Sequence, residues 1–247
     1  MNVLEVRHVK KSFGKKIVLD DVNFSVNAGE CLGIVGLSGG GKSTLVKIVT
    51  RLLDCDDGEI FLCGKNITHA TGNDFYRDMQ MIFQMPEDSF DPRRTLGESI
   101  AEPIKSFELR ALSFKKLLIS PLKAQSLQLK ALNERVENLL VEVGLPKNYS
   151  ERYPREVSGG ECQRAAIARA ISINPKLLIC DEATSALDVT IQAQIVALIK
   201  RLCVEKNFAC LFITHELNIL PKIADRVLEL ENGRLKNFDG SNFWEIT

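Results

Sequence analysis

One stretch of this chain has the residue types and spacing of a phosphate-binding loop. Residues 36–43, GLSGGGKS, fit G-x-x-x-x-G-K-[ST] and stand between an apolar run and a helical pattern. The glycines let backbone N–H groups form a nest for anions at a helix N-terminus, Lys42 supplies positive charge for the β- and γ-phosphates, and the Ser43 hydroxyl can bind Mg²⁺. The alternative is a glycine-rich turn without a ligand, but a chance match is on the order of one in a hundred. The predicted loop residues are Gly36, Leu37, Ser38, Gly39, Gly40, Gly41, Lys42, Ser43 and Thr44.

Two acidic residues, Asp181 and Glu182, follow the apolar run Leu177–Cys180. Enzymes with a phosphate loop hold their metal with an acid at the end of such a strand. We therefore expect Asp181 to hold Mg²⁺ through water and Glu182 to orient or deprotonate the attacking water. Taken alone, the pattern also fits acidic residues in the first turn of a helix. The phosphate loop favours the catalytic interpretation.

Hydrophobic periodicity indicates the elements that must position these residues. Alternating or continuous apolar runs predict strands at 3–9, 17–24, 31–35, 60–62, 81–83, 177–180 and 209–213. Helical patterns cover 44–53, much of 100–145, 163–173 and 191–203. Strand, glycine-rich loop and helix thus follow one another in the order that the phosphate loop requires.

The order of these elements predicts an α/β fold. We expect a phosphate-loop, RecA-like core with a parallel sheet, an N-terminal antiparallel β subdomain and an inserted α-helical subdomain, which together make residues 1–247 a single domain. The expected sublobes are 1–84, which holds the β subdomain and the first half of the core, 85–162, which is helical, and 163–247, which is the second half of the core.

Composition narrows the class of protein further. Of 247 residues 45% are hydrophobic, which is enough for a sizeable core, and 32 basic against 32 acidic residues leave no net charge to attract nucleic acid. No apolar run approaches the roughly 18 residues of a membrane span. The start of the chain carries Glu5, Arg7 and Lys10, unlike a signal peptide. We expect a soluble chain whose seven cysteines are reduced thiols that pack as small hydrophobic residues.

Residues 156–164, EVSGGECQR, lie upstream of Asp181, and with them the chain resembles the ATP-binding cassette (ABC) ATPases of membrane transporters. We name this stretch the signature segment. Other landmarks of that family appear in order: Gln84 looks like its Q-loop glutamine, Ser185–Asp188 like its D-loop, and His215 like its switch histidine. Phe13 stands where an adenine-stacking aromatic is expected. Alone, each has an ordinary structural explanation, such as Ser158 capping a helix.

The resemblance implies a split active site that uses ATP and Mg²⁺. In a head-to-tail dimer, the signature segment of one subunit, with Ser158, Gly159 and Gly160, closes over the nucleotide held by the phosphate loop of the other. Lys42 stabilises the transition state, and Glu182 polarises the water. His215 holds the γ-phosphate geometry, and Gln84 senses both metal and phosphate. The implied metal ligands are Ser43, Gln84 and Asp181.

Three stretches are similar to the branch of importers for dipeptides, oligopeptides and nickel, namely Ser89–Glu98, Ala101–Pro103 and Ser185–Ile195. Ala183 replaces a common proline, and the C-terminal extension of many peptide-type members is missing, so the sequence favours nickel or another metal complex over peptides. The implied partners are two membrane permease subunits, a sister ATPase subunit or a second copy, and an external solute-binding protein, at the cytoplasmic face of the membrane. A soluble ABC ATPase switched by nucleotide is the alternative.

Two further features allow more than one interpretation. The segment Lys105–Lys130 is rich in lysine, which fits either a solvated helical face or contact with anionic lipid or an acidic partner loop. Cys162 lies beside the signature glycines and is expected to be a passive side chain, although its oxidation would block closure of a dimer.

Overall fold

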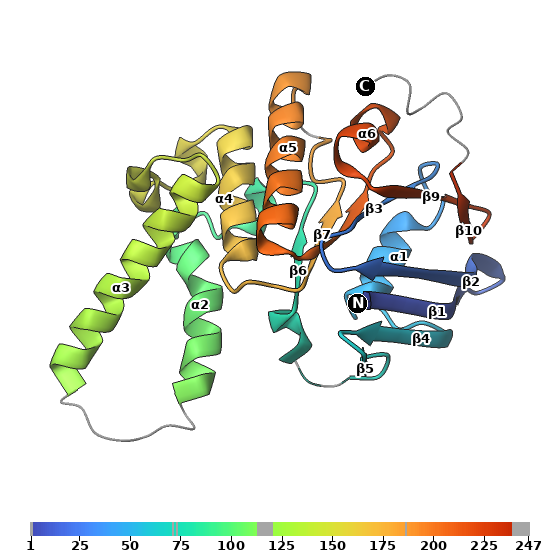
Figure 1. Cartoon of the computed structure of the whole chain (residues 1–247), viewed down its shortest axis with the longest axis horizontal. Helices are drawn as coiled ribbons and strands as arrows, with labels where there is room; N and C mark the ends of the chain where they lie inside the picture. Colours follow the sequence, from blue (N-terminus) through green and yellow to red (C-terminus); the bar gives the residue numbers. More distant parts are fainter. Residues whose placement is uncertain (1, 71, 73, 113–120, 186, 239–247) are drawn as a thin grey trace. The chain divides into compact units, whose positions relative to one another are not determined.

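The structure is a computed structural model that describes residues 2–70, 72, 74–112, 121–185 and 187–238, with side chains except those of 108–112 and 121–128. The chain divides into two compact units, Met1–Gln84 with Pro175–Thr247, and Met85–Asn174. The first unit contains both sheets, and the second is helical (Figure 1). The helical unit ends at residue 174, later than the boundary at 162 expected from the sequence, because the helix after the signature segment packs on the other helices of that unit.

A six-stranded sheet forms the centre of the first unit. Its order is β10-β9-β3-β8-β7-β6, and neighbouring strands are parallel except for β10, which pairs antiparallel with β9. Strands β3 and β8 are buried along their whole length, as expected for apolar runs covered on both faces. The strands are β3 (Cys31–Val35), β6 (Met79–Ile82), β7 (Leu177–Asp181), β8 (Ala209–Ile213), β9 (Arg226–Glu231) and β10 (Arg234–Asn237).

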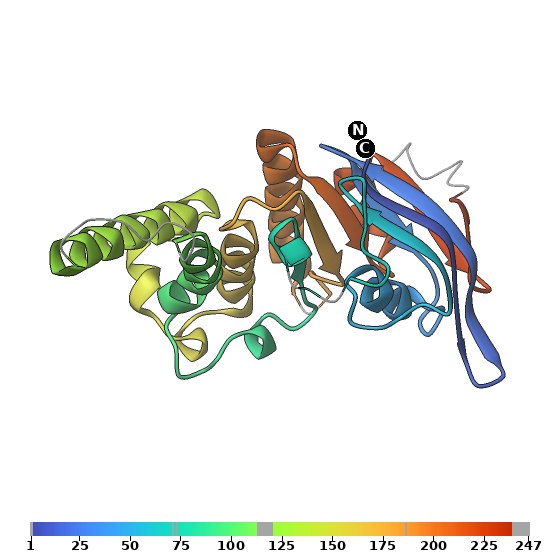
Figure 2. The same cartoon turned by 90° about the horizontal axis from the view of Figure 1, so that it is seen from below.

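A four-stranded antiparallel sheet in the order β2-β1-β4-β5 completes the β structure of this unit. Its strands are β1 (Asn2–Phe13), β2 (Lys16–Asn27), β4 (Asp57–Leu62) and β5 (Lys65–Asn66). Helix α1 (Lys42–Val49) shares one hydrophobic core with both sheets, and Figure 2 shows it beside them. Core residues from the three elements include Val6, Ile34 and Leu45.

The other face of the six-stranded sheet carries α5 (Val189–Lys206) and α6 (Leu220–Ile223). The fit of α6 is close, since a Cβ on Gly33 of β3 would lie only 2.8 Å from the Leu220 Cδ2 atom. On α5, the Cys203 thiol donates to the carbonyl oxygen of Phe208 over 3.0 Å. The parallel sheet is therefore covered on both faces, as its apolar strands require.

The second unit is built from α2 (Leu96–Leu112), α3 (Pro121–Glu142) and α4 (Gly159–Ile171). The apolar residues Val136 and Leu140 near the end of α3 are buried. In the basic segment, Lys105 and Lys130 are exposed. The side chains of the other basic residues of this segment, Arg110, Lys115, Lys116 and Lys123, lie outside the described residues. The short helical turns of the chain are η1 (Asp74–Arg77), η2 (Glu87–Ser89), η3 (Lys147–Glu151), η4 (Pro154–Glu156) and η5 (Leu217–Ile219).

The predicted α/β fold is confirmed, with its parallel core, N-terminal antiparallel sheet and inserted helices. Strands β5, β9 and β10 were not predicted, and β1 and β2 are longer than their alternating segments indicated. All seven cysteines are free, as expected. Among the described residues, no helix combines the length and the apolar character needed to cross a bilayer.

Candidate active site

The topology of the central sheet brings the predicted site residues of the first unit to one edge. Four adjacent parallel strands, in the order β3-β8-β7-β6, end just before Gly36, Thr214, Glu182 and Phe83. The register sets these strand ends side by side, since Ile34 and Asp181 both pair with Ile213. Ligands of open α/β sheets bind at the carboxyl ends of the strands, which is the edge where these loops lie.

The phosphate loop runs from the end of β3 to the start of α1 and lies tightly against neighbouring backbone. A Cβ on Gly36 would fall 2.5 Å from the Leu230 carbonyl oxygen. Gly41 precedes α1 with a φ of 102°, and a Cβ there would lie 3.0 Å from the Val18 carbonyl oxygen. Both positions therefore need glycine, and the loop can turn its backbone toward the space in front of α1.

The buried side chain of Lys42 is hydrogen-bonded to the backbone of this loop. Lys42 is only 6% exposed, and its ammonium group donates to the carbonyl oxygens of Gly36, over 2.7 Å, and Leu37, over 3.0 Å. These contacts hold Nζ at the centre of the loop, where a phosphate would meet its charge.

A pocket of about 360 Å³ opens in front of the loop. From the sequence-predicted set it is lined by Phe13, Ser38, Gly39, Gly41, Lys42, Ser43, Thr44 and Glu182. Lys16 and Val18 of β2 also line it, and the sequence did not single them out because they are ordinary residues of an alternating strand. Leu37 and Gly40 line a neighbouring pocket instead. Phe13 is 51% exposed, so part of its ring is accessible to a flat ligand.

Glu182, which lines this pocket, lies against His215. Oε1 of Glu182 lies 3.1 Å from Nδ1 of His215. The Glu182 backbone N–H donates to the Ile213 carbonyl oxygen over 2.9 Å, and Glu182 has a φ of 50°, which few residues other than glycine adopt. Backbone strain of this kind concentrates at functional sites.

Asp181 lies one residue earlier, at the end of β7. Burial raises the pKa of its carboxyl, the charge of Glu182 raises it further, and the charge of Lys42 opposes both. A bound cation would stabilise the charged form of a carboxyl in such surroundings, so Asp181 is suited to hold a metal ion near the phosphate loop.

Gln84 is exposed and does not line the pocket, but it is connected to Glu182 through Ser185. The Gln84 side-chain N–H donates to Ser185 Oγ over 3.1 Å, and Ser185 Oγ donates to the Glu182 carbonyl oxygen over 3.1 Å. The predicted Q-loop and D-loop residues are thus joined by hydrogen bonds beside the predicted base. Ala186 of the D-loop lies outside the described residues.

The signature residues Ser158, Gly159 and Gly160 belong to the second unit, at the start of α4. Ser158 caps this helix together with Glu161, whose Oε2 accepts from the Ser158 N–H over 2.8 Å and from Ser158 Oγ over 3.0 Å. The Tyr149 hydroxyl donates to the other oxygen of Glu161 over 2.6 Å. The Tyr149 hydroxyl first, and the Ser158 N–H second, lower the pKa of Glu161.

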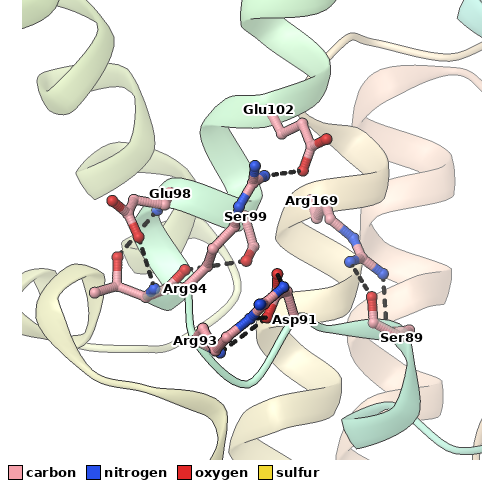
Figure 3. Close-up of polar contacts among 9 residues, drawn as sticks. Ser89, Asp91, Arg93, Arg94, Glu98, Ser99, Glu102 and Arg169 are labelled. Carbon is pink, nitrogen blue, oxygen red and sulfur yellow. Dashed lines mark hydrogen bonds and ion pairs between the residues drawn. The ribbon is translucent and has the colours of Figure 1, made fainter.

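Polar contacts also connect α4 to the segment that follows Gln84 (Figure 3). The Arg169 guanidinium donates to the Ser89 carbonyl oxygen over 2.6 Å and to Ser89 Oγ over 2.8 Å, and it lies 4.4 Å from the centre of the Phe90 ring. Burial lowers the pKa of Arg169. Arg169 therefore fixes the start of the Ser89–Glu98 stretch to the helix that begins with the signature glycines.

The sequence profile of one family, described as ABC transporter, matches residues 19–185. The chain belongs to this family. It is 40% identical to the oligopeptide transport ATP-binding protein OppF of Haemophilus influenzae, over 94% of this chain and 70% of that protein. It is 39% identical to the OppF protein of Bacillus subtilis, over 94% of this chain and 74% of that protein.

Solved structures of ABC cassettes have the same fold as this ABC family member. A dimeric structure of the cassette MJ0796 in a post-hydrolysis state, bound to ADP and phosphate, has a TM-score of 0.74 and 26% identity, over 95% of this chain and 97% of that one. A second dimeric structure of MJ0796 has a TM-score of 0.75 and 27% identity.

Membership of the family makes the chain an ATPase that uses ATP with Mg²⁺. Its residues fit this ligand. The loop glycines allow the loop to lie against the backbone of Leu230 and Val18, where a Cβ would collide, and the Lys42 ammonium stands in that loop. The Ser43 hydroxyl and the Asp181 carboxylate are the oxygen ligands that Mg²⁺ prefers. When bound, Mg²⁺ neutralises charge that develops on the β- and γ-phosphates.

Proposed function

We propose that this chain is the ATP-hydrolysing subunit of an importer for short peptides. The observation that carries the proposal is the position of Glu182, which lines the same pocket as the phosphate loop and lies 3.1 Å from His215. A base, a polar group that orients it and a phosphate-binding loop are thereby gathered at one edge of the sheet. Those are the parts that hydrolysis of a γ-phosphate needs.

In the proposed reaction, Glu182 accepts a proton from the attacking water while the water oxygen forms a bond to the γ-phosphorus. The bond from that phosphorus to the bridging oxygen breaks, and ADP leaves. Lys42 stabilises the charge of the transition state, and His215 holds Glu182 and the transferring group in line. Phe13 would stack on the adenine, and Ser43, Asp181 and Gln84 would hold the metal.

The proposal extends to a dimer. The phosphate-loop pocket belongs to the first unit and the signature residues to the second. We propose that Ser158, Gly159 and Gly160 of one copy or sister subunit cover the nucleotide on the other, so that ATP closes the dimer and hydrolysis opens it. The dimeric state of the MJ0796 cassettes supports this arrangement.

The cargo and the partners follow from the relatives. The sequence favoured nickel or another metal complex over peptides, but the OppF proteins that the chain resembles at 39–40% identity are named for oligopeptide transport. We therefore propose peptides as the cargo. The chain would act at the cytoplasmic face of the membrane, bound to two permease subunits and supplied by an external solute-binding protein.

Uptake by cells tests the cargo. In the source organism, the gene is altered to encode Glu182→Gln, and the uptake of a labelled oligopeptide and of nickel ions is measured beside the parent strain. Loss of peptide uptake with parental nickel uptake supports the proposal. Loss of nickel uptake alone assigns the metal as cargo, and parental uptake of both overturns the importer function.

A further inference from the structure

Gln192 is a buried polar residue of the first unit, only 5% exposed, and is the fourth residue of α5. A buried amide needs hydrogen-bond partners, because leaving it unpaired costs about 1–3 kcal/mol. The start of α5 is itself fixed, since the Asp188 side chain accepts from the N–H groups of Thr190 and Ile191, both over 3.1 Å. Gln192 is therefore held in a defined place relative to the strand ends.

The Gln192 amide contacts both loops that carry the proposed catalytic pair. Its Nε2 donates to Oε2 of Glu216 over 2.5 Å and lies 3.4 Å from Oγ1 of Thr184. Glu216 directly follows His215, and Thr184 lies two residues after Glu182. One side chain thus joins the loop after β8 to the loop after β7.

The loop after β8 is held at a second point. The Glu216 backbone N–H donates to Oγ1 of Thr214 over 3.0 Å, and Thr214 is only 2% exposed. The Thr214 N–H in turn donates to the Ile34 carbonyl oxygen of β3 over 3.2 Å. Thr214 is therefore fixed to the sheet, and Glu216 is fixed to α5. Because these two residues flank His215, the backbone of His215 is held in place on both sides.

We propose that Gln192 is a positioning residue that keeps His215 against Glu182. The hydrogen bond from its amide to the charged Glu216 carboxylate is of the strong, charge-assisted kind. It fixes the backbone beside His215, while the contact with Thr184 holds the turn after Glu182. The inference rests on the proposed roles of Glu182 and His215.

A pair of exchanged side chains tests this inference. Gln192→Glu places two carboxylates at hydrogen-bond distance, so they repel and push the loop of His215 away. Because misplacement by 1 Å costs about 100-fold in rate, we expect kcat for ATP to fall by that order while KM for ATP stays close to the parent value. Glu216→Gln alone keeps an amide that can accept from Gln192, and we expect only a small loss.

The double variant Gln192→Glu with Glu216→Gln restores an amide that donates to a carboxylate, with the two groups exchanged. We expect it to recover most of the kcat lost by Gln192→Glu, a coupling that a purely structural role of either residue would not produce. Gln194→Leu, two residues further along α5 and exposed, serves as the matched control and should keep parental kcat. Urea denaturation of each variant checks that it is folded.

The outcomes separate this inference from the proposed function. Parental kcat in Gln192→Glu, or a double variant no better than Gln192→Glu, overturns the positioning role. Glu182→Gln and His215→Ala are measured in the same assay. If those two variants keep parental ATPase activity, the proposed roles of the catalytic pair fail, whatever the Gln192 variants do.

Discussion

Oε1 of Glu182 and Nδ1 of His215 lie 3.1 Å apart although they belong to different loops of the sheet. Their contact follows from strand pairing, because Asp181 at the end of β7 pairs with Ile213 at the end of β8. Adjacent parallel strands end at the same edge of the sheet. The residues that directly follow them, here Glu182 and His215 with its neighbour Thr214, are therefore brought together by the strand pairing itself.

Replacing Glu182 by glutamine should separate binding from hydrolysis. The amide cannot take a proton from water, and general-base catalysis contributes about 10²–10⁴-fold in rate, so we expect kcat for ATP to fall by that factor. Binding of ATP should persist, and the closed dimer should accumulate. Phosphate release and light scattering after size-exclusion chromatography with ATP measure the two effects.

The control for this variant is Glu205→Gln near the end of α5, where Glu205 is exposed and lies 3.3 Å from Arg201 in a surface ion pair. It should hydrolyse ATP at the parental rate. A Glu182→Gln protein that turned over ATP as fast as the parent would remove Glu182 as the base.

Replacing Asp181 by asparagine should stabilise the protein without nucleotide while abolishing hydrolysis that depends on Mg²⁺. The pKa of Asp181 is raised by burial. The folded state therefore binds the carboxyl proton of Asp181 more tightly than the unfolded state does. The stability that the protonated carboxyl contributes at acid pH is lost as the pH rises through the raised pKa. At neutral pH the charged carboxylate costs stability, which asparagine avoids.

Thermal denaturation at neutral and at mildly acidic pH measures this effect. We expect the Tm of Asp181→Asn to exceed that of the parent by a few degrees at neutral pH, with the difference shrinking toward acid pH. A variant with a Tm below the parent at neutral pH would show that the Asp181 charge is stabilised and not strained by its surroundings.

Replacing Glu161 by glutamine should strengthen the response to ATP. Ser158 Oγ donates a hydrogen bond to the Glu161 carboxylate over 3.0 Å. The pKa of Glu161 is lowered, so this carboxylate is charged at neutral pH. Glutamine keeps the helix cap but removes this charge from the helix N-terminus. The hydroxyl and the helix dipole then favour a phosphate more strongly.

We expect Glu161→Gln to lower KM for ATP several-fold and to dimerise at lower ATP concentration. The matched control is Glu156→Gln, because the Glu156 carboxylate accepts from the Tyr153 N–H over 2.8 Å one turn before the signature glycines. An unchanged or raised KM in Glu161→Gln, with a parental KM in the control, would contradict the proposed contact between Ser158 and phosphate.

Replacing Arg169 by methionine should destabilise the helical unit. The two hydrogen bonds from its guanidinium to Ser89 are lost, and bonds to charged groups contribute about 1.5–3 kcal/mol. We expect the free energy of unfolding in urea to fall by an amount in that range. Arg93→Met is the control, since Arg93 is 87% exposed and its ion pair with Asp91 at 3.1 Å is a surface pair worth little. Equal losses in the two variants would contradict the anchoring role.

Much of the fold and of the site was predictable from the sequence because the signals are local. The phosphate loop, the acids after β7 and the buried strands depend on residues that are neighbours in the chain. The bounds of the elements were less predictable. Helix α4 begins at Gly159 and belongs to the helical unit, since its partners α2 and α3 are known only once the helices pack.

The sequence by itself determined which groups can bind phosphate and which can act as acids and bases, because those properties reside in the residue types and their spacing. Only the tertiary structure decided which of them meet. The contact of Glu182 with His215, the link from Gln84 through Ser185, and the bond from Gln192 to Glu216 each join residues from different elements. Such contacts depend on strand order and register, and these are set by burial of apolar faces across the whole sheet.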